Sequence, residues 1–160
     1  METVEYNEWV PMGTLVKGLV VMIIALIIFI TGTILFLGGL SLESFFAVTL
    51  NVGVFTFIAF LFWNYRGLRI QITKEKLTVV YGVFNKKSLL LKDITSCKRT
   101  KANLGRYFGI GIRYGTDGSL AYTTSFGDAV EVAPRTGRVF VFSSSRPDQV
   151  CDIMKKGNDL

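Results

Sequence analysis

Hydrophobic residues follow one another without interruption in the first part of the chain and alternate with polar residues in the second part. The two uninterrupted runs cover residues 18–40 and 45–63, and neither contains a charged residue. As helices they would be about 35 and 28 Å long, which is enough to cross the hydrocarbon core of a bilayer. Because only residues 41–44 separate the runs, we expect an antiparallel membrane hairpin whose two ends lie on the same side.

This pattern divides the chain into five segments. We expect an N-terminal interfacial segment at 1–14, transmembrane helices at 15–40 and 45–65, a short extracytoplasmic loop at 41–44 and a cytoplasmic domain at 66–160. The first helix differs from a secretory signal peptide because glutamates, rather than basic residues, precede it. Its apolar run is also longer than a signal peptide requires.

The positions of lysine and arginine predict the orientation of the hairpin. The connecting loop has no basic residue, whereas the flanks of the two runs carry Lys17, Arg66, Arg69, Lys74 and Lys76. Since basic residues concentrate on the cytoplasmic side, we expect a multi-pass protein of the cell membrane with both termini in the cytoplasm. Four aromatic residues would form a belt at that interface: Tyr6, Trp9, Trp63 and Tyr65.

Small and polar residues inside the spans indicate where helices touch. A seven-residue repeat of small side chains runs along the first helix: Gly18, Ala25, Gly32 and Gly39. We expect this face to pack within the hairpin, and a contact with another membrane protein or subunit is the alternative. The amide of Asn51 needs a hydrogen-bond partner in hydrocarbon. We expect that partner across the hairpin at Thr31 or Thr33, and a functional role for the amide is the alternative.

From Leu68 onward the period of the pattern becomes two, which predicts β-strands. Leu68, Ile70 and Ile72 alternate with polar residues, and a turn at 73–76 leads into a second strand. Further strands are expected at 88–91, 94–100, 110–114, 120–124, 128–132 and 138–142. About eight short strands are typical of an antiparallel barrel or sandwich. An amphipathic helix at about 146–157 would cap it, with Pro147 in its first turn.

Several stretches of this domain resemble the bacterial and archaeal pleckstrin-homology-like (PH-like) domains that adjoin transmembrane helices. The similar stretches are 72–82 (ITKEKLTVVYG), 88–94 (SLLLKDI), 128–132 (DAVEV), 137–141 (GRVFV) and 145–148 (SRPD). The resemblance covers about residues 66 to 157. It implies an antiparallel β-barrel closed by a C-terminal helix and a binding or scaffolding role at the membrane. It brings no shared catalytic residue.

The chemistry-bearing residues argue against catalysis, so we expect no catalytic residue, no metal and no cofactor. The chain has no histidine, which removes most metal sites and every histidine-dependent triad. Asp128 and Glu131 are close in sequence, but their odd spacing would place them on opposite faces of a strand. Cys97 and Cys151 lack a histidine as base, and a cytoplasmic location would keep both reduced. A disulfide between them becomes plausible only if the topology is inverted.

Charge is distributed unevenly along the chain. Residues 1–65 carry a net charge of −3 and residues 66–160 a net charge of +9. The candidate residues for binding an anion, a lipid headgroup or a protein partner are Arg66, Arg69, Lys86, Lys87, Lys98, Arg99, Lys101 and Arg106. A solvated basic face that merely follows the positive-inside bias is the alternative. Nucleic acid is not expected, because the aromatic residues follow strand periodicity instead of forming a stacking platform.

Together these patterns predict a non-catalytic, membrane-anchored adaptor integral to the lipid bilayer. Its basic domain would be presented to a protein partner or to anionic lipid headgroups. The alternative is an accessory subunit of a larger membrane complex that docks through the first helix. A homo-oligomer is a further possibility that the sequence leaves open.

Overall fold

The computed structural model describes residues 4–39 and 41–158, so the remaining residues of the predicted segments (1–3, 40 and 159–160) lie outside the described part. The chain forms two compact units. One is the helical pair Thr14–Asn64, which we call the membrane hairpin. The other joins the residues before the hairpin to those from Tyr65 onward, and we call it the β unit.

The membrane hairpin consists of helices α1 (Thr14–Gly38) and α2 (Leu42–Asn64). Both are long and apolar enough to cross a membrane, as the sequence predicts. The first turn of α2 is held by Ser41, whose carbonyl accepts from the Phe45 amide at 3.0 Å and whose hydroxyl accepts from the Ser44 amide at 3.1 Å. The half-buried positions of α1 recur about every three or four residues, as expected of a helix that packs on one neighbour: Val16, Val20, Ile23, Ile24, Ile27, Thr31 and Ile34.

The first sheet of the β unit is antiparallel and contains β1 (Val4–Pro11), β2 (Gly67–Thr73), β3 (Lys76–Tyr81) and β4 (Asn85–Leu90), in that spatial order. The strand β1 corrects the expectation of an interfacial segment. It pairs with β2, and Tyr6, which is only 8% exposed, belongs to the core and not to an aromatic belt. The alternation of Tyr6, Glu8 and Val10 with outward residues is a strand pattern whose partner comes only after the hairpin.

The second sheet is mixed and has the order β5-β8-β9-β7-β6. Its strands are β5 (Ile94–Ala102), β6 (Gly111–Tyr114), β7 (Leu120–Thr123), β8 (Gly127–Pro134) and β9 (Phe140–Ser143), with β7 parallel to β9. A short 3₁₀ helix, η1 (Leu91–Asp93), precedes β5, and a single helical turn, α3 (Leu104–Tyr107), follows it. No strand pairing within the described residues joins the two sheets, so the expected closed barrel is not formed.

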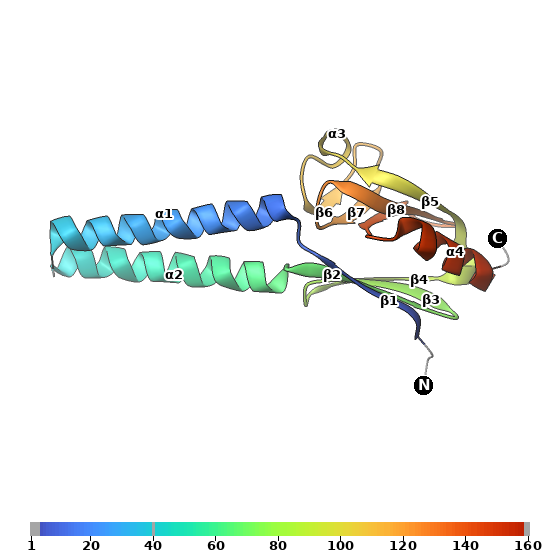
Figure 1. Cartoon of the computed structure of the whole chain (residues 1–160), viewed down its shortest axis with the longest axis horizontal. Coiled ribbons are helices and arrows are strands. Elements are labelled where there is room, and N and C mark those ends of the chain that lie inside the picture. The colour runs from blue at the N-terminus through green and yellow to red at the C-terminus, as the bar shows by residue number, and fades with distance from the viewer. Residues whose placement is uncertain (1–3, 40, 159–160) are drawn as a thin grey trace. The chain divides into compact units, whose positions relative to one another are not determined.

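The core of the β unit lies between the inner faces of the two sheets. Fully buried side chains from β2 and β3 meet others from β8 and β9: Leu68, Ile70, Leu77, Val79, Val130, Val132, Phe140 and Phe142. The C-terminal helix α4 (Pro147–Asn158) begins one residue after its predicted start and packs against β5 and β8 (Figure 1). Its apolar stripe, Val150 and Met154, completes the core. The coarse prediction of an antiparallel β-domain with one C-terminal helix is therefore confirmed in part.

The membrane hairpin is inserted between two neighbouring strands of one sheet. β1 precedes α1 and β2 follows α2, yet Val10 lies opposite Leu68 in the β1–β2 register. A sheet cannot extend across a bilayer, so the two ends of the hairpin lie on the same side of any membrane that it crosses. This agrees with the hairpin expected from the short loop.

Candidate binding surface

Three of the candidate cations are neutralised by carboxylates of the same unit. Lys98 on β5 contacts Glu131 on β8 at 2.9 Å, and the Nη1 atom of Arg106 donates to the same carboxylate at 2.7 Å. Arg99 pairs with Asp128 at 3.0 Å and with Asp148 of α4 at 3.2 Å. These side chains hold β5, β8 and α4 together, and they do not form an open anion site.

Arg106 is the centre of a network that fixes the loop after β5. Its backbone amide donates to the Asn103 side chain at 2.8 Å, which caps α3, and its Nε donates to Asp117 at 2.9 Å. The carboxylate of Asp117 also accepts from the Ser119 hydroxyl at 2.6 Å. The guanidinium lies 5.2 Å from the centre of the Tyr107 ring. The network joins α3 to the turn between β6 and β7.

Electrostatics in this network favour the ionised carboxylates. Hydrogen bonds from Ser119, followed by those from Arg106, hold the pKa of Asp117 at about 2, below its ordinary value of 3.8. Burial by itself would raise the pKa of Glu131, but hydrogen bonds from Lys98 and Arg106 outweigh it and the pKa is lowered. Both carboxylates are therefore charged at neutral pH and form ion pairs with Lys98 and Arg106. These ion pairs serve to hold the fold together.

A different set of residues gathers on the outer face of the first sheet. Trp9 lies opposite Arg69, Arg69 opposite Val80, and Val80 opposite Lys86. Residues that face one another across an antiparallel pair share one side of the sheet, so these four form a row across all four strands. We call it the Trp9 row. The Arg69 guanidinium is 6.0 Å from the centre of the Trp9 ring, within cation–π range.

Gly67 allows the Trp9 ring to lie flat over β2. A Cβ atom at Gly67 would collide with three atoms of the indole, so a larger residue would lift the ring from the strand. Trp9 itself is 47% exposed. The ring is thus held in place on its strand side and open on the other, as a side chain available for contact would be.

The sequence-predicted basic patch is therefore divided by the structure. Arg69 and Lys86 come together on the first sheet, whereas Lys98, Arg99 and Arg106 are used in ion pairs of the second. Lys87 lies opposite Val79 on the other side of β4, and Lys101 lies opposite Asp128. Arg66 lies just before β2, where its carbonyl accepts from the Met12 amide at 2.8 Å. Trp9 is a member that sequence reasoning missed, although the alternation along residues 4–11 carries the signal.

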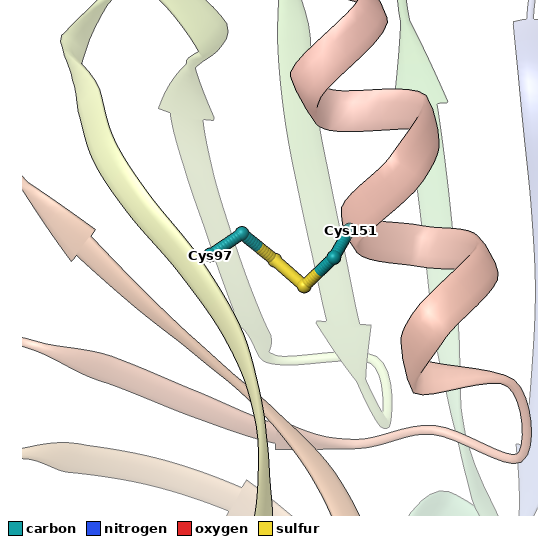
Figure 2. The surroundings of a disulfide bond; sticks show 2 residues. All are labelled: Cys97 and Cys151. Carbon is teal, nitrogen blue, oxygen red and sulfur yellow. A yellow bond between two sulfur atoms is a disulfide. The ribbon is translucent and has the colours of Figure 1, made fainter. Parts of the chain in front are cut away.

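Cys97 and Cys151 form a disulfide, which corrects the expectation of two reduced cysteines (Figure 2). Their Cα atoms are 5.5 Å apart, inside the range that a disulfide can bridge. Cys97 is half-buried on β5 and Cys151 is buried on α4, so the bond fixes the helix to the sheet beneath it. The sequence raised this pair only for an inverted topology, and the two cysteines are 54 residues apart.

The membrane hairpin uses its small and polar residues differently from expectation. A Cβ atom added at Gly18 or Gly32 would meet nothing within 4 Å, so these two do not line the contact between α1 and α2. Ala25 is exposed on the same side, and Gly39 lies beyond the end of α1. The expectation that this stripe packs within the hairpin is wrong for its helical members, which face outward.

Asn51 is half-buried on α2, and its amide donates to the Ala47 carbonyl of its own helix at 3.0 Å. Thr31 and Thr33 likewise bond to carbonyls four residues earlier, at 2.8 and 2.9 Å. The expected bond across the hairpin is therefore not formed. A carbonyl four residues back is within reach of each of these side chains and satisfies it locally.

An apolar groove lies between the helices near their connection. Its volume is about 490 Å³, and Phe29, Ile34 and Leu37 of α1 and Ala47 of α2 line it. The described residues include no group of three or more cysteine, aspartate or glutamate side chains that could hold a metal ion. No protein-family model, curated protein or solved structure matches this chain.

Proposed function

We propose that the chain is a non-catalytic, membrane-anchored binding protein whose PH-like β unit captures an acidic protein partner. The observation that carries this proposal is the Trp9 row. It combines an aromatic ring with the cations Arg69 and Lys86 on a sheet face. Tryptophan and arginine are the residue types that contribute most to protein–protein binding energy.

The charge on the Trp9 row is available for an external partner. Lys98, Arg99 and Arg106 are matched by carboxylates of the β unit, whereas no described carboxylate is paired with Arg69 or Lys86. The lysines of β4 also make it a poor edge for strand addition, because charged edge residues oppose pairing with another chain. A partner is therefore expected to bind the face of the sheet and not its β4 edge.

We further propose that both termini lie in the cytoplasm. The shared sheet of β1 and β2 requires both ends of the hairpin to be on one side, and the basic residues that flank the spans favour the cytoplasmic one. The Cys97–Cys151 bond favours an oxidising compartment. We base the proposal on the charges, and the labelling experiment below decides between the two indications.

Labelling with a membrane-impermeant thiol reagent tests this topology. The variants are Ser41→Cys, in the connection, and Lys155→Cys, on α4, each made in a Cys97→Ser, Cys151→Ser background. In intact cells we expect labelling of the Ser41→Cys protein alone. Labelling of the Lys155→Cys protein alone would place the β unit outside the cytoplasm, where a permanent disulfide is ordinary.

Charge reversal tests the binding surface. We compare Arg69→Glu, Lys86→Glu with Lys155→Glu, Lys156→Glu, which makes the same change of charge near the end of α4. After cross-linking in native membranes, we expect the first variant to lose its partner adduct at least about tenfold and the second to retain it. Equal yields from both variants and the unmodified protein would overturn the proposal.

A second candidate function is favoured by the outward position of Gly18 and Gly32. Small residues on an open helix face allow another helix to approach closely, as in an accessory subunit of a membrane complex. Gly32→Leu should then abolish recovery of the complex, while Thr33→Leu, which adds bulk on an adjacent face, should spare it. The binding-protein proposal predicts that both variants keep the partner.

A further inference from the structure

Both connections to the membrane hairpin leave the β unit at the same end, which we call the attachment end. Pro11 at the end of β1 lies opposite Gly67 at the start of β2. The Met12 amide donates to the Arg66 carbonyl at 2.8 Å, and the Gly13 amide donates to the Thr124 carbonyl after β7 at 2.9 Å. The attachment end therefore includes the ends of strands from both sheets.

Two turns at the attachment end each present a phenylalanine, and a third phenylalanine, Phe108, lies shortly before the strand β6 that starts at this end. The β3–β4 turn carries Phe84, beside the Leu68–Tyr81 pair, and the β7–β8 turn carries Phe126. Phe108 lies between α3 and β6, whose first residue pairs with the last residue of β7. Phe84 and Phe108 are each 72% exposed and Phe126 is 39% exposed. The turn residues 82–84, 108–110 and 124–126 contain no charge.

The turns at the opposite end of the β unit are charged, in contrast to those at the attachment end. The β2–β3 turn, η1 and the β8–β9 turn meet there, since the Leu91 amide donates to the Glu75 carbonyl at 2.8 Å and the Arg135 amide to the Asp93 carbonyl at 2.7 Å. These turns carry charged side chains: Lys74, Glu75, Lys92, Asp93, Arg135 and Arg138. Ordinary surface turns are polar, so the attachment end is the exceptional one.

Phe108 has a further unusual feature. It is the one non-glycine residue with a positive φ, 53°, within the described chain. A bulky side chain in this left-handed region is disfavoured, and glycine normally ends a helix in this way. The fold gains no core contact from the ring, because the ring is exposed. An apolar ring at a strained and exposed position therefore requires an explanation outside the packing of the β unit.

We propose that the attachment end is immersed in the interfacial layer of the bilayer, with Phe84, Phe108 and Phe126 among the lipid headgroups and upper acyl chains. The connectivity of the chain indicates that a lipid surface is what these phenylalanines contact. Gly13 is bonded directly to Thr14 of α1 and Tyr65 directly to Asn64 of α2, so no linker separates this end from the spans. Aromatic side chains favour the interface, and uncharged turns avoid the cost of desolvating ions there.

This inference rests on the proposed membrane anchoring and adds a second attachment to it. With the turns in the leaflet, the β unit would be held at a fixed inclination instead of turning freely about two peptide bonds. The Trp9 row would then be presented close to the leaflet surface, because the Trp9 ring lies over Gly67 at this same end.

Photochemical cross-linking of the full chain tests the inference without changing its cysteines or tryptophans. Benzoylphenylalanine replaces Phe84, Phe108 or Phe126 in separate variants, and the proteins are placed in vesicles of phosphatidylcholine and phosphatidylglycerol. The matched control carries the same group at Val4, which is also apolar and exposed but lies opposite Thr73 at the other end of the sheet. Melting curves that match the unmodified protein identify the variants that fold.

We expect lipid adducts, detected by intact mass, at the three phenylalanine positions and at least tenfold less at Val4. Adducts between two protein chains, or equal lipid yields at all four positions, would overturn the inference. An alkaline carbonate wash separates this failure from that of the anchoring itself. A protein that the wash removes from the vesicles is not integral, whereas one that remains without adducts contradicts only the immersion of the turns.

Discussion

Arg106 and Asp117 are joined by two hydrogen bonds to a single carboxylate oxygen, from Nε at 2.9 Å and from Nη2 at 2.5 Å. The two residues belong to different segments, the turn α3 and the turn before β7. The bonds therefore link two parts of the segment between β5 and β7, namely α3 and the turn that precedes β7. Because Arg106 also donates to Glu131, the loop is fastened to the second sheet by charge and not by apolar packing.

This charge network predicts a loss of stability in acid. The pKa of Asp117 is about 2 in the folded state against an ordinary 3.8, so its contribution is complete above about pH 4 and is lost as the pH falls through 2. Urea unfolding in nanodiscs should show the midpoint falling over this range. Asp117→Asn should lower stability at neutral pH and reduce the slope. A remaining slope is expected from Glu131, whose pKa is also lowered. An unchanged slope would contradict the ion pair.

The disulfide predicts a difference between the oxidised and reduced protein. The bond closes a long loop, with the two cysteines 54 residues apart, and such bonds contribute about 2–4 kcal/mol, chiefly by restricting the unfolded chain. Reductant should lower the free energy of unfolding of the unmodified protein by this amount. The Cys97→Ser, Cys151→Ser variant is the control and should not respond. A protein that is equally stable with and without reductant would show that the cysteines are not bonded.

Gly67→Ala should disturb the Trp9 row. The new methyl group would occupy the place of the Trp9 indole, and overpacking of this kind costs about 1–3 kcal/mol. We expect a change in Trp9 fluorescence, measured with Trp63 replaced by phenylalanine, and weaker binding of the partner. Gly105→Ala is the matched control, because its new Cβ would meet only Asn103 at 3.9 Å. Combining Gly67→Ala with Trp9→Leu should restore part of the stability.

Val10→Asp tests whether β1 is a structural strand. Val10 is buried opposite Leu68, and an unpaired carboxylate at this position would destabilise the β unit by several kcal/mol, about 3 or more. Circular dichroism should show loss of β structure or a much lower melting temperature. Asn7→Asp places the same charge on an exposed position of the same strand and should change little. If the Val10→Asp protein were unaffected, residues 4–11 would not be a core strand, and the expectation of an interfacial segment would stand.

Local patterns predicted the parts of the fold whose partners are close in sequence. The apolar runs gave α1 and α2, the alternation around residues 68–81 gave the β2–β3 hairpin, and Pro147 marked the start of α4. The pairing of β1 was not predictable because its neighbour, β2, lies beyond the whole hairpin. Strand spacing left a barrel and a sandwich open because it does not reveal which edges meet, and the two sheets do not close into a barrel.

The candidate site was harder to predict because it depends on register. Counting charges placed Lys98 and Arg106 among the candidates, but only the β5–β8 and α3 geometry shows that both contact Glu131. The odd spacing of Asp128 and Glu131 correctly separated their faces, yet it did not reveal the cations that each would bind. The outward position of Gly32 likewise follows from which face of α1 meets α2, and the seven-residue repeat alone does not specify that face.

The insertion of the membrane hairpin between β1 and β2 has a consequence for how the protein is made. During synthesis β1 leaves the ribosome first, but its neighbour in the sheet is translated only after both spans. β1 therefore cannot pair with β2 until the two helices between them have been made. Completion of the sheet requires both ends of the hairpin to be on the same side, because a hairpin that crossed a membrane only once would leave β1 and β2 on opposite sides.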